Sequence, residues 1–146
     1  MLKNIPPILS PELLKILMEM GHGDEIVIAD GNFPSEACGQ RVVRADGHSG
    51  NEILTAIMQL FPLDSYVDRP IALMAVAEKD KGLNPEIWNE YNAIIKKYEP
   101  ENCRIELVER FDFYDRAKKA YAIIATGETA IYANIILKKG VVNVNE

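Results

Sequence analysis

Short apolar runs rich in β-branched residues alternate with helix-forming segments over most of the 146-residue chain. The runs are bounded by turn residues, which is typical of strands. Strands that alternate with helices predict an α/β fold, in which a mainly parallel sheet lies between helix layers. A short turn joins the last two strands, so we expect an antiparallel C-terminal addition within a single domain. The predicted strands span residues 25–29, 41–45, 71–77, 104–108, 121–126 and 135–137.

Three segments carry the residues of a helix start ahead of periodic apolar positions. Ser10 and Ser49 are hydroxyl caps, and an acid follows Ser49 at the spacing of a capping box. The proline after Ser10 and Pro85 both suit the beginning of a helix. A further helix is expected over 111–120. The glycines and proline of 31–40 predict a loop that walls the functional site.

Charge and apolar content limit the partners of the chain. A net charge of −6 repels polyanions, which argues against nucleic acid or an anionic membrane as the main partner. No apolar run is long enough to span a bilayer and no leader-like segment opens the chain, so the expected location is cytoplasmic. In that reducing compartment Cys38 and Cys103, which lack metal-ligand spacing, are predicted to be free thiols.

The stretch 21–30 holds the candidate catalytic group. His22 lies between two glycines ahead of a predicted strand, and Asp30 follows that strand at its carboxyl end, where α/β proteins bind ligands. An imidazole titrates near pH ~6.5, so it both gives and takes protons at neutral pH. We hypothesise that His22 moves protons and that Asp30 holds a small polar substrate beside it. The same residues also fit a surface histidine and a loop-capping aspartate.

Two later segments add groups that suit the recognition of hydroxyls. Arg110 precedes an aromatic cluster and either binds hydroxyls or carboxylates or forms a surface ion pair with Asp112 or Asp115. Tyr132 and Asn134 flank one residue ahead of the last strand. An aromatic face covers the C–H groups of a sugar while amide and hydroxyl groups bond its oxygens. The alternative is one core tyrosine and one turn asparagine at the start of a strand.

Standard motifs of several other chemistries are missing from the sequence. It has no glycine-rich phosphate loop, no zinc spacing and no Gly-x-Ser-x-Gly elbow, which argues against nucleotide chemistry and serine-triad hydrolysis. His48 follows the turn pair Asp46-Gly47, and it either belongs to that turn or edges the site. A divalent metal held by His22, Asp30 and His48 is a further alternative, although their spacing has no metal signature. No metal or other cofactor is therefore expected.

Several motifs occur in an order that resembles one known family. The chain resembles the ribose pyranase and L-fucose mutarotase family over nearly its whole length, and the fucose branch more closely. No single motif is diagnostic, but their shared order is a strong signal. The motifs are Gly21-His22-Gly23-Asp24-Glu25 with Asp30, Phe33-Pro34, Arg44-Ala45-Asp46-Gly47, Leu63-Asp64-Ser65-Tyr66, 110–117, Thr126-Gly127-Glu128 and 132–140.

The resemblance implies a role for each matching residue. His22 corresponds to the proton donor of the family. Ala133 stands where the family often has glycine, a small departure that should leave a backbone contact intact. The positions implied to bind substrate are Asp30, Arg110, Tyr132, Ala133 and Asn134.

The resemblance also implies a substrate and an assembly. Residues 1–146 would form one sugar mutarotase domain that interconverts the α and β anomers of L-fucose, with pyranase action on ribose-like sugars as a related activity. Similar proteins form homo-oligomers, as a pentameric ring or a decamer of two rings, with the site at a subunit boundary. Two rival classes stay open: a non-catalytic sugar-binding or regulatory module, and a metal-dependent sugar isomerase.

Overall fold

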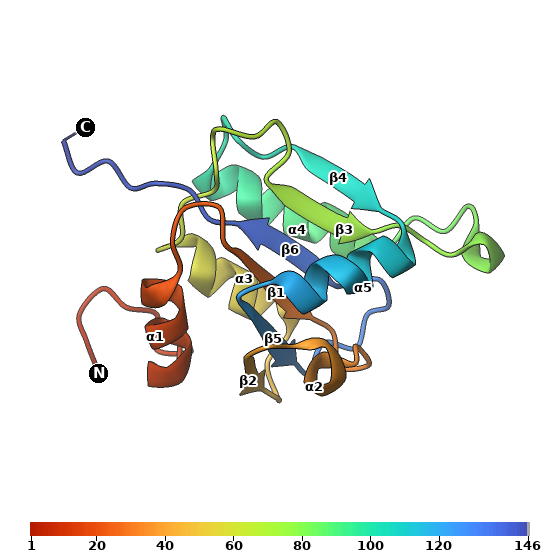
Figure 1. The fold of residues 1–146 in the computed structure, drawn as a ribbon, viewed down its shortest axis with the longest axis horizontal. Helices are drawn as coiled ribbons and strands as arrows, with labels where there is room; N and C mark the ends of the chain where they lie inside the picture. The colour runs from red at the N-terminus through yellow and green to blue at the C-terminus, as the bar shows by residue number, and fades with distance from the viewer. Residues whose placement is uncertain (146) are drawn as a thin grey trace.

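The computed structural model describes residues 1–145. Its centre is one six-stranded sheet with the strand order β2-β5-β1-β6-β3-β4 (Figure 1). All of the predicted strands are present, although β3 ends earlier than its apolar run predicts. The strands are β1 (Glu25–Ala29), β2 (Val42–Ala45), β3 (Ile71–Met74), β4 (Ile105–Val108), β5 (Ala122–Thr126) and β6 (Ile135–Lys138).

The sheet is mixed, and its one reversed strand lies in the interior. β5 is parallel to β1 and β2, and β3 is parallel to β4. β6 runs antiparallel to both of its neighbours, β1 and β3. The predicted α/β class with an antiparallel C-terminal strand is confirmed. The short connection between β5 and β6 led us to expect that these two strands pair. They do not pair, because β1 lies between them. The side chains of Ile135, Ile136 and Leu137 are fully buried, which suits an interior strand.

The helices begin largely where the sequence predicts. Ser10 Oγ accepts a hydrogen bond from the Leu13 N–H at 3.1 Å, and Ser49 Oγ caps the next long helix in the same way. Glu109 caps α5, which therefore begins at Arg110 rather than 111. The loop predicted for 31–40 contains one short helix. The helices are α1 (Pro11–Glu19), α2 (Ser35–Cys38), α3 (Gly50–Met58), α4 (Glu86–Tyr98) and α5 (Arg110–Lys119), with a 3₁₀ turn η1 (Glu78–Asp80).

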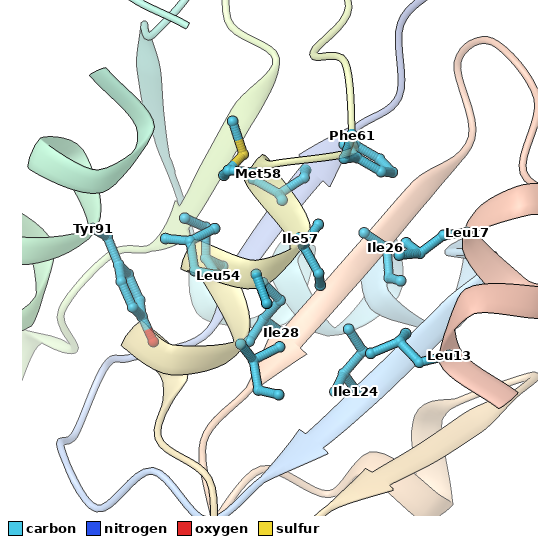
Figure 2. Packing of buried hydrophobic residues seen from close by; sticks show 14 of the residues in the cluster. Leu13, Leu17, Ile26, Ile28, Leu54, Ile57, Met58, Phe61, Tyr91 and Ile124 are labelled. Carbon is cyan, nitrogen blue, oxygen red and sulfur yellow. The ribbon is translucent and has the colours of Figure 1, made fainter. Parts of the chain in front are cut away.

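Different helices cover the two faces of the sheet (Figure 1). Ile26 and Ile28 of β1 pack on the side of α1, α3 and α4, while Val27 packs on the side of α5. Figure 2 shows Leu17 of α1 beside Ile26, and Leu13 of α1 beside Ile124 of β5. Each fully buried side chain of this size contributes about 1.5–3 kcal/mol to folding. The strand ends that carry polar residues are thus supported by a packed core on both faces.

Two further expectations concern the whole chain. Cys38 and Cys103 are free thiols, as predicted. Within residues 1–145, every helix is too short or too polar to cross a bilayer.

Candidate functional site

A pocket of about 550 Å³ opens at the sheet edge where β1 and β3 end and β6 begins. Four predicted site residues line it: Asp30, Arg110, Tyr132 and Asn134. They come from segments far apart in the sequence. Because β6 runs antiparallel to β1, its amino end meets the carboxyl end of β1, which brings 132–134 next to Asp30. The sheet topology therefore assembles this half of the predicted site.

Asp30 is the buried acid of the pocket, with a residue exposure of 7%. Its carboxylate accepts from the Asn32 N–H at 3.0 Å, and its own N–H donates to Asn134 Oδ1 at 2.7 Å. Burial raises the pKa of the Asp30 carboxyl, while N–H groups of Asn32, Phe33 and Ala133 and the Asn134 amide oppose the shift. The site thus holds a partly desolvated acid whose donors leave it oriented toward the pocket.

Tyr132 has a φ of 58°, a left-handed conformation that is uncommon for a bulky residue. Such a conformation costs about 1–3 kcal/mol and persists only where the surroundings hold it. Its carbonyl accepts from the Trp88 indole N–H at 2.7 Å. Its hydroxyl accepts from the Ala77 N–H at 3.0 Å and donates to Asp80 at 2.5 Å, and this bond raises the pKa of the phenol. Tyr132 therefore ties the start of β6 to the loop that follows β3.

Arg110 begins α5 on the far side of the pocket. Its guanidinium lies 5.4 Å from the Phe111 ring centroid and 5.7 Å from that of Tyr114. These rings hold an exposed cation at the pocket rim. The sequence analysis quoted Phe33 only as part of a motif and did not mention Met74, and both side chains also line the pocket. Phe33 follows the carboxyl end of β1, and Met74 is the last residue of β3. This position at a strand end was the available signal.

Ala133, the middle residue of the predicted Tyr-x-Asn segment, is fully buried. Its side chain is not part of the pocket wall. Its carbonyl accepts from the Tyr91 hydroxyl at 2.9 Å. Any contact of this residue with a ligand would therefore involve the backbone. A backbone contact is also what the presence of alanine in place of glycine leaves possible.

His22 lies at the opposite end of β1 from this pocket. Gly23, with a φ of 88°, turns the chain directly before β1, and its N–H donates to the Lys139 carbonyl at 2.8 Å. The five residues of β1 then separate His22 from Asp30, and the strand alone spans about 13 Å at ~3.3 Å per step. The hypothesis that His22 stands beside Asp30 is therefore wrong within one chain. A turn before a strand and a residue after it necessarily lie at opposite sheet edges.

The acid that His22 does meet is Asp64. His22 Nε2 lies 2.9 Å from Asp64 Oδ1; the imidazole side chain is 45% exposed and the carboxylate 4% exposed. The ring of Tyr66 lies 5.2 Å from the imidazole, centroid to centroid. Burial alone would raise the pKa of Asp64, but hydrogen bonds from the Tyr66 N–H and from His22 lower it below its ordinary value. Sequence reasoning quoted the 63–66 motif but gave Asp64 no role.

The alternative metal site is not assembled. His48 lies 3.3 Å from Glu52 at the start of α3, through its Nδ1 atom. Among the described residues 1–145, no three histidine, cysteine or acidic side chains gather as metal ligands. His22, Asp30 and His48 therefore do not meet in one chain.

The pocket combines aromatic faces, a carboxyl, an amide and a guanidinium, which defines a site for a small ligand rich in hydroxyls. The family model of the RbsD / FucU transport protein family matches residues 3–142. The chain belongs to this family.

Relatives within the family carry more specific names. The chain is 48% identical over 151 aligned residues to "Fucose mutarotase" of Homo sapiens, covering 99% of this chain and 96% of the relative. The fold matches that of the Streptococcus pneumoniae fucose mutarotase in complex with L-fucose, with a TM-score of 0.91 and 54% identity, over 97% of this chain and all of that one. Bacillus subtilis RbsD complexed with D-ribose is less similar, with a TM-score of 0.73, 27% identity and 92% and 95% coverage.

Proposed function

We propose that this protein is an L-fucose mutarotase, in which His22 transfers protons and Asp30, Arg110, Tyr132 and Asn134 bind the sugar. The observation that carries the proposal is the high similarity to a fucose mutarotase crystallised with L-fucose, over nearly the full length of both chains. The lower similarity to the ribose-bound relative favours fucose over ribose as the preferred sugar. On this proposal residues 1–146 act as one mutarotase domain.

Interconversion of anomers requires the ring to open and close. A proton is added to the ring oxygen and one leaves the anomeric hydroxyl, so the C1–ring oxygen bond breaks as a C1 carbonyl forms. The C1 carbonyl then rotates, and the ring closes when the ring oxygen attacks the other face of this carbonyl. Ring closure reverses both proton transfers. A single group that acts as acid and then as base assists both directions, typically by ~10²–10⁴-fold.

The contact with Asp64 suits His22 for this role. An ionised carboxylate only accepts hydrogen bonds, so the Nε2 atom that faces Asp64 at 2.9 Å carries a proton. The other ring nitrogen, Nδ1, is then left to exchange a proton with the sugar. The buried charge of Asp64 also stabilises the imidazolium that forms when Nδ1 is protonated.

We further propose that the sugar lies between two copies of the chain, with the pocket from one and His22 from the next. The separation of His22 and the pocket within one chain supports this arrangement. Exposed apolar side chains flank both parts: Tyr66 is 80% exposed beside His22, and Phe111 and Ile131 are 65% and 56% exposed beside the pocket. A pentameric ring or a decamer of two rings places every copy's His22 against a neighbouring pocket.

A complementation experiment tests the enzyme and its assembly together. Saturation-transfer NMR on L-fucose at anomeric equilibrium measures exchange, with D-ribose and a chelator as separate arms. We expect wild-type protein to exchange fucose without loss to the chelator, and His22→Ala and Asp30→Ala to be inactive alone. Co-expressed, the two variants should regain about a quarter of wild-type activity, because one boundary in four combines an intact His22 with an intact pocket.

Other results would contradict specific parts of the proposal. Saturable fucose binding without exchange in the wild type would indicate a binding module. Retained exchange in His22→Ala would remove the catalytic assignment. Mixed oligomers that co-purify through two tags but stay inactive would show that the two halves do not meet across a boundary.

A further inference from the structure

The segment 132–134 is held from behind by α4. Trp88 and Tyr91 lie three residues apart, so they project from one face of that helix. The Trp88 indole N–H donates to the Tyr132 carbonyl at 2.7 Å, and the Tyr91 hydroxyl donates to the Ala133 carbonyl at 2.9 Å. Two successive carbonyls thus accept hydrogen bonds from successive turns of one helix. Both donors lie outside the pocket wall.

Fixing these carbonyls also fixes what the same peptide groups present on their other side. The C=O and N–H of a trans peptide point in opposite directions, and the described chain has no cis peptide. The peptide between Tyr132 and Ala133 has its carbonyl bound by Trp88, so its N–H, that of Ala133, points away from the indole, and this N–H lowers the pKa of the Asp30 carboxyl. The next peptide joins Ala133 to Asn134. The side-chain amide oxygen of Asn134 accepts a hydrogen bond from the Asp30 N–H.

We propose that Trp88 and Tyr91 are positioning residues of the sugar site, which orient two peptide planes so that Tyr132, Asn134 and Asp30 hold their binding geometry. The proposal rests on the proposed function for the identity of the sugar. The positive φ of Tyr132 supports it, because a bulky residue keeps that conformation only under external restraint.

The packing of α3 against α4 makes room for one of these bonds. A Cβ atom placed on Gly50 would lie 1.9 Å from the Tyr91 hydroxyl oxygen. Only glycine at this position of α3 lets the buried hydroxyl reach the Ala133 carbonyl. An aromatic ring placed only to fill the core would not need such an approach.

The decisive variants are Trp88→Phe and Tyr91→Phe, which keep a ring and delete one donor. The matched control is Ile95→Val, a fully buried position of the same helix whose side chain has no hydrogen-bond donor, so the change weakens packing and deletes no bond to 132–134. For each variant we would measure Tm, the Kd for L-fucose, and the KM and kcat of anomer exchange. We expect Trp88→Phe to raise Kd and KM about tenfold with kcat within about twofold, because a lost hydrogen bond displaces binding groups and leaves His22 unchanged. Ile95→Val should lower Tm and leave Kd unchanged.

Crystal structures of the two decisive variants separate this inference from the proposed function. If wild-type protein binds no fucose, the proposed function fails, while a rotated peptide between Tyr132 and Ala133 in Trp88→Phe still supports the positioning role of Trp88. An unrotated peptide, or a Kd that follows Tm equally in Trp88→Phe and Ile95→Val, would overturn it. If Trp88→Phe does not fold, Tyr91→Phe decides by the same two measurements.

Discussion

An acid lies at each end of β1, and the pKa values of the two acids, Asp30 and Asp64, are shifted in opposite directions. At the carboxyl end, burial raises the pKa of Asp30 beside a pocket rich in binding groups. At the amino end, the Tyr66 N–H and His22 overcome the effect of burial and lower the pKa of Asp64. One end is thus equipped to bind a ligand and the other to move a proton. Neither end alone holds both the pocket and the imidazole, which is the reason for our proposal that a complete site includes a second chain.

At the proton-transfer end, the largest effect expected after the complete loss in His22→Ala follows from Asp64→Asn. The amide lacks the charge that stabilises the imidazolium and can present the wrong group to Nε2, so exchange should fall by about 10²-fold. Fucose affinity should stay within about twofold, because Asp64 contacts the Nε2 side of the imidazole and not the Nδ1 atom that is proposed to face the sugar. Saturation-transfer NMR and a fucose titration measure the two quantities. A loss of fucose affinity with intact exchange would contradict this assignment, because Asp64 would then support binding rather than proton transfer.

The same variant has a stability signature. A carboxyl whose pKa is lowered by folding stabilises the native state above its ordinary pKa near ~3.9, and this contribution is lost as pH falls through the folded value. The stability difference between wild type and Asp64→Asn should therefore shrink as the pH falls below ~4. Urea unfolding across pH measures it, and a difference that grows in acid would contradict the assignment.

The contrast between the ends also separates what sequence could predict from what it could not. Hydrophobic periodicity and caps predicted the strands and most helices, because both are local signals. Asp30 was placed correctly at the carboxyl end of its strand, where the pocket opens, since that rule depends only on its own strand. The position of β6 between β1 and β3, and hence the approach of Tyr132 to Asp30, depends on long-range pairing that periodicity does not encode. The contact between His22 and Asp64, which are 42 positions apart, was not predicted for the same reason.

An intermediate effect is expected at the rim of the pocket. Arg110→Ala removes an exposed guanidinium and should weaken fucose binding about tenfold, because a charged group no longer bonds the sugar hydroxyls. Tm should change little, as for most exposed substitutions. The matched control is Arg104→Ala, an exposed arginine that pairs with Asp68 away from the pocket. A large fall in Tm with unchanged affinity would show that Arg110 supports α5 rather than the ligand.

The smallest effect concerns the stability cost of the binding end. A carboxyl whose pKa is raised by folding disfavours the native state once it ionises, so stability is lost as pH rises through the folded pKa of Asp30. Asp30→Asn keeps an acceptor for the Asn32 N–H but carries no charge. It should therefore weaken fucose binding and yet raise Tm at neutral pH, by no more than about 4 °C. The gain should vanish below pH ~3.9, where both proteins are neutral at this position.

Thermal unfolding at neutral and acid pH measures the difference. A neutral-pH Tm below that of the wild type would mean that the charge of Asp30 stabilises the fold, and the two ends of β1 would no longer differ in the way described.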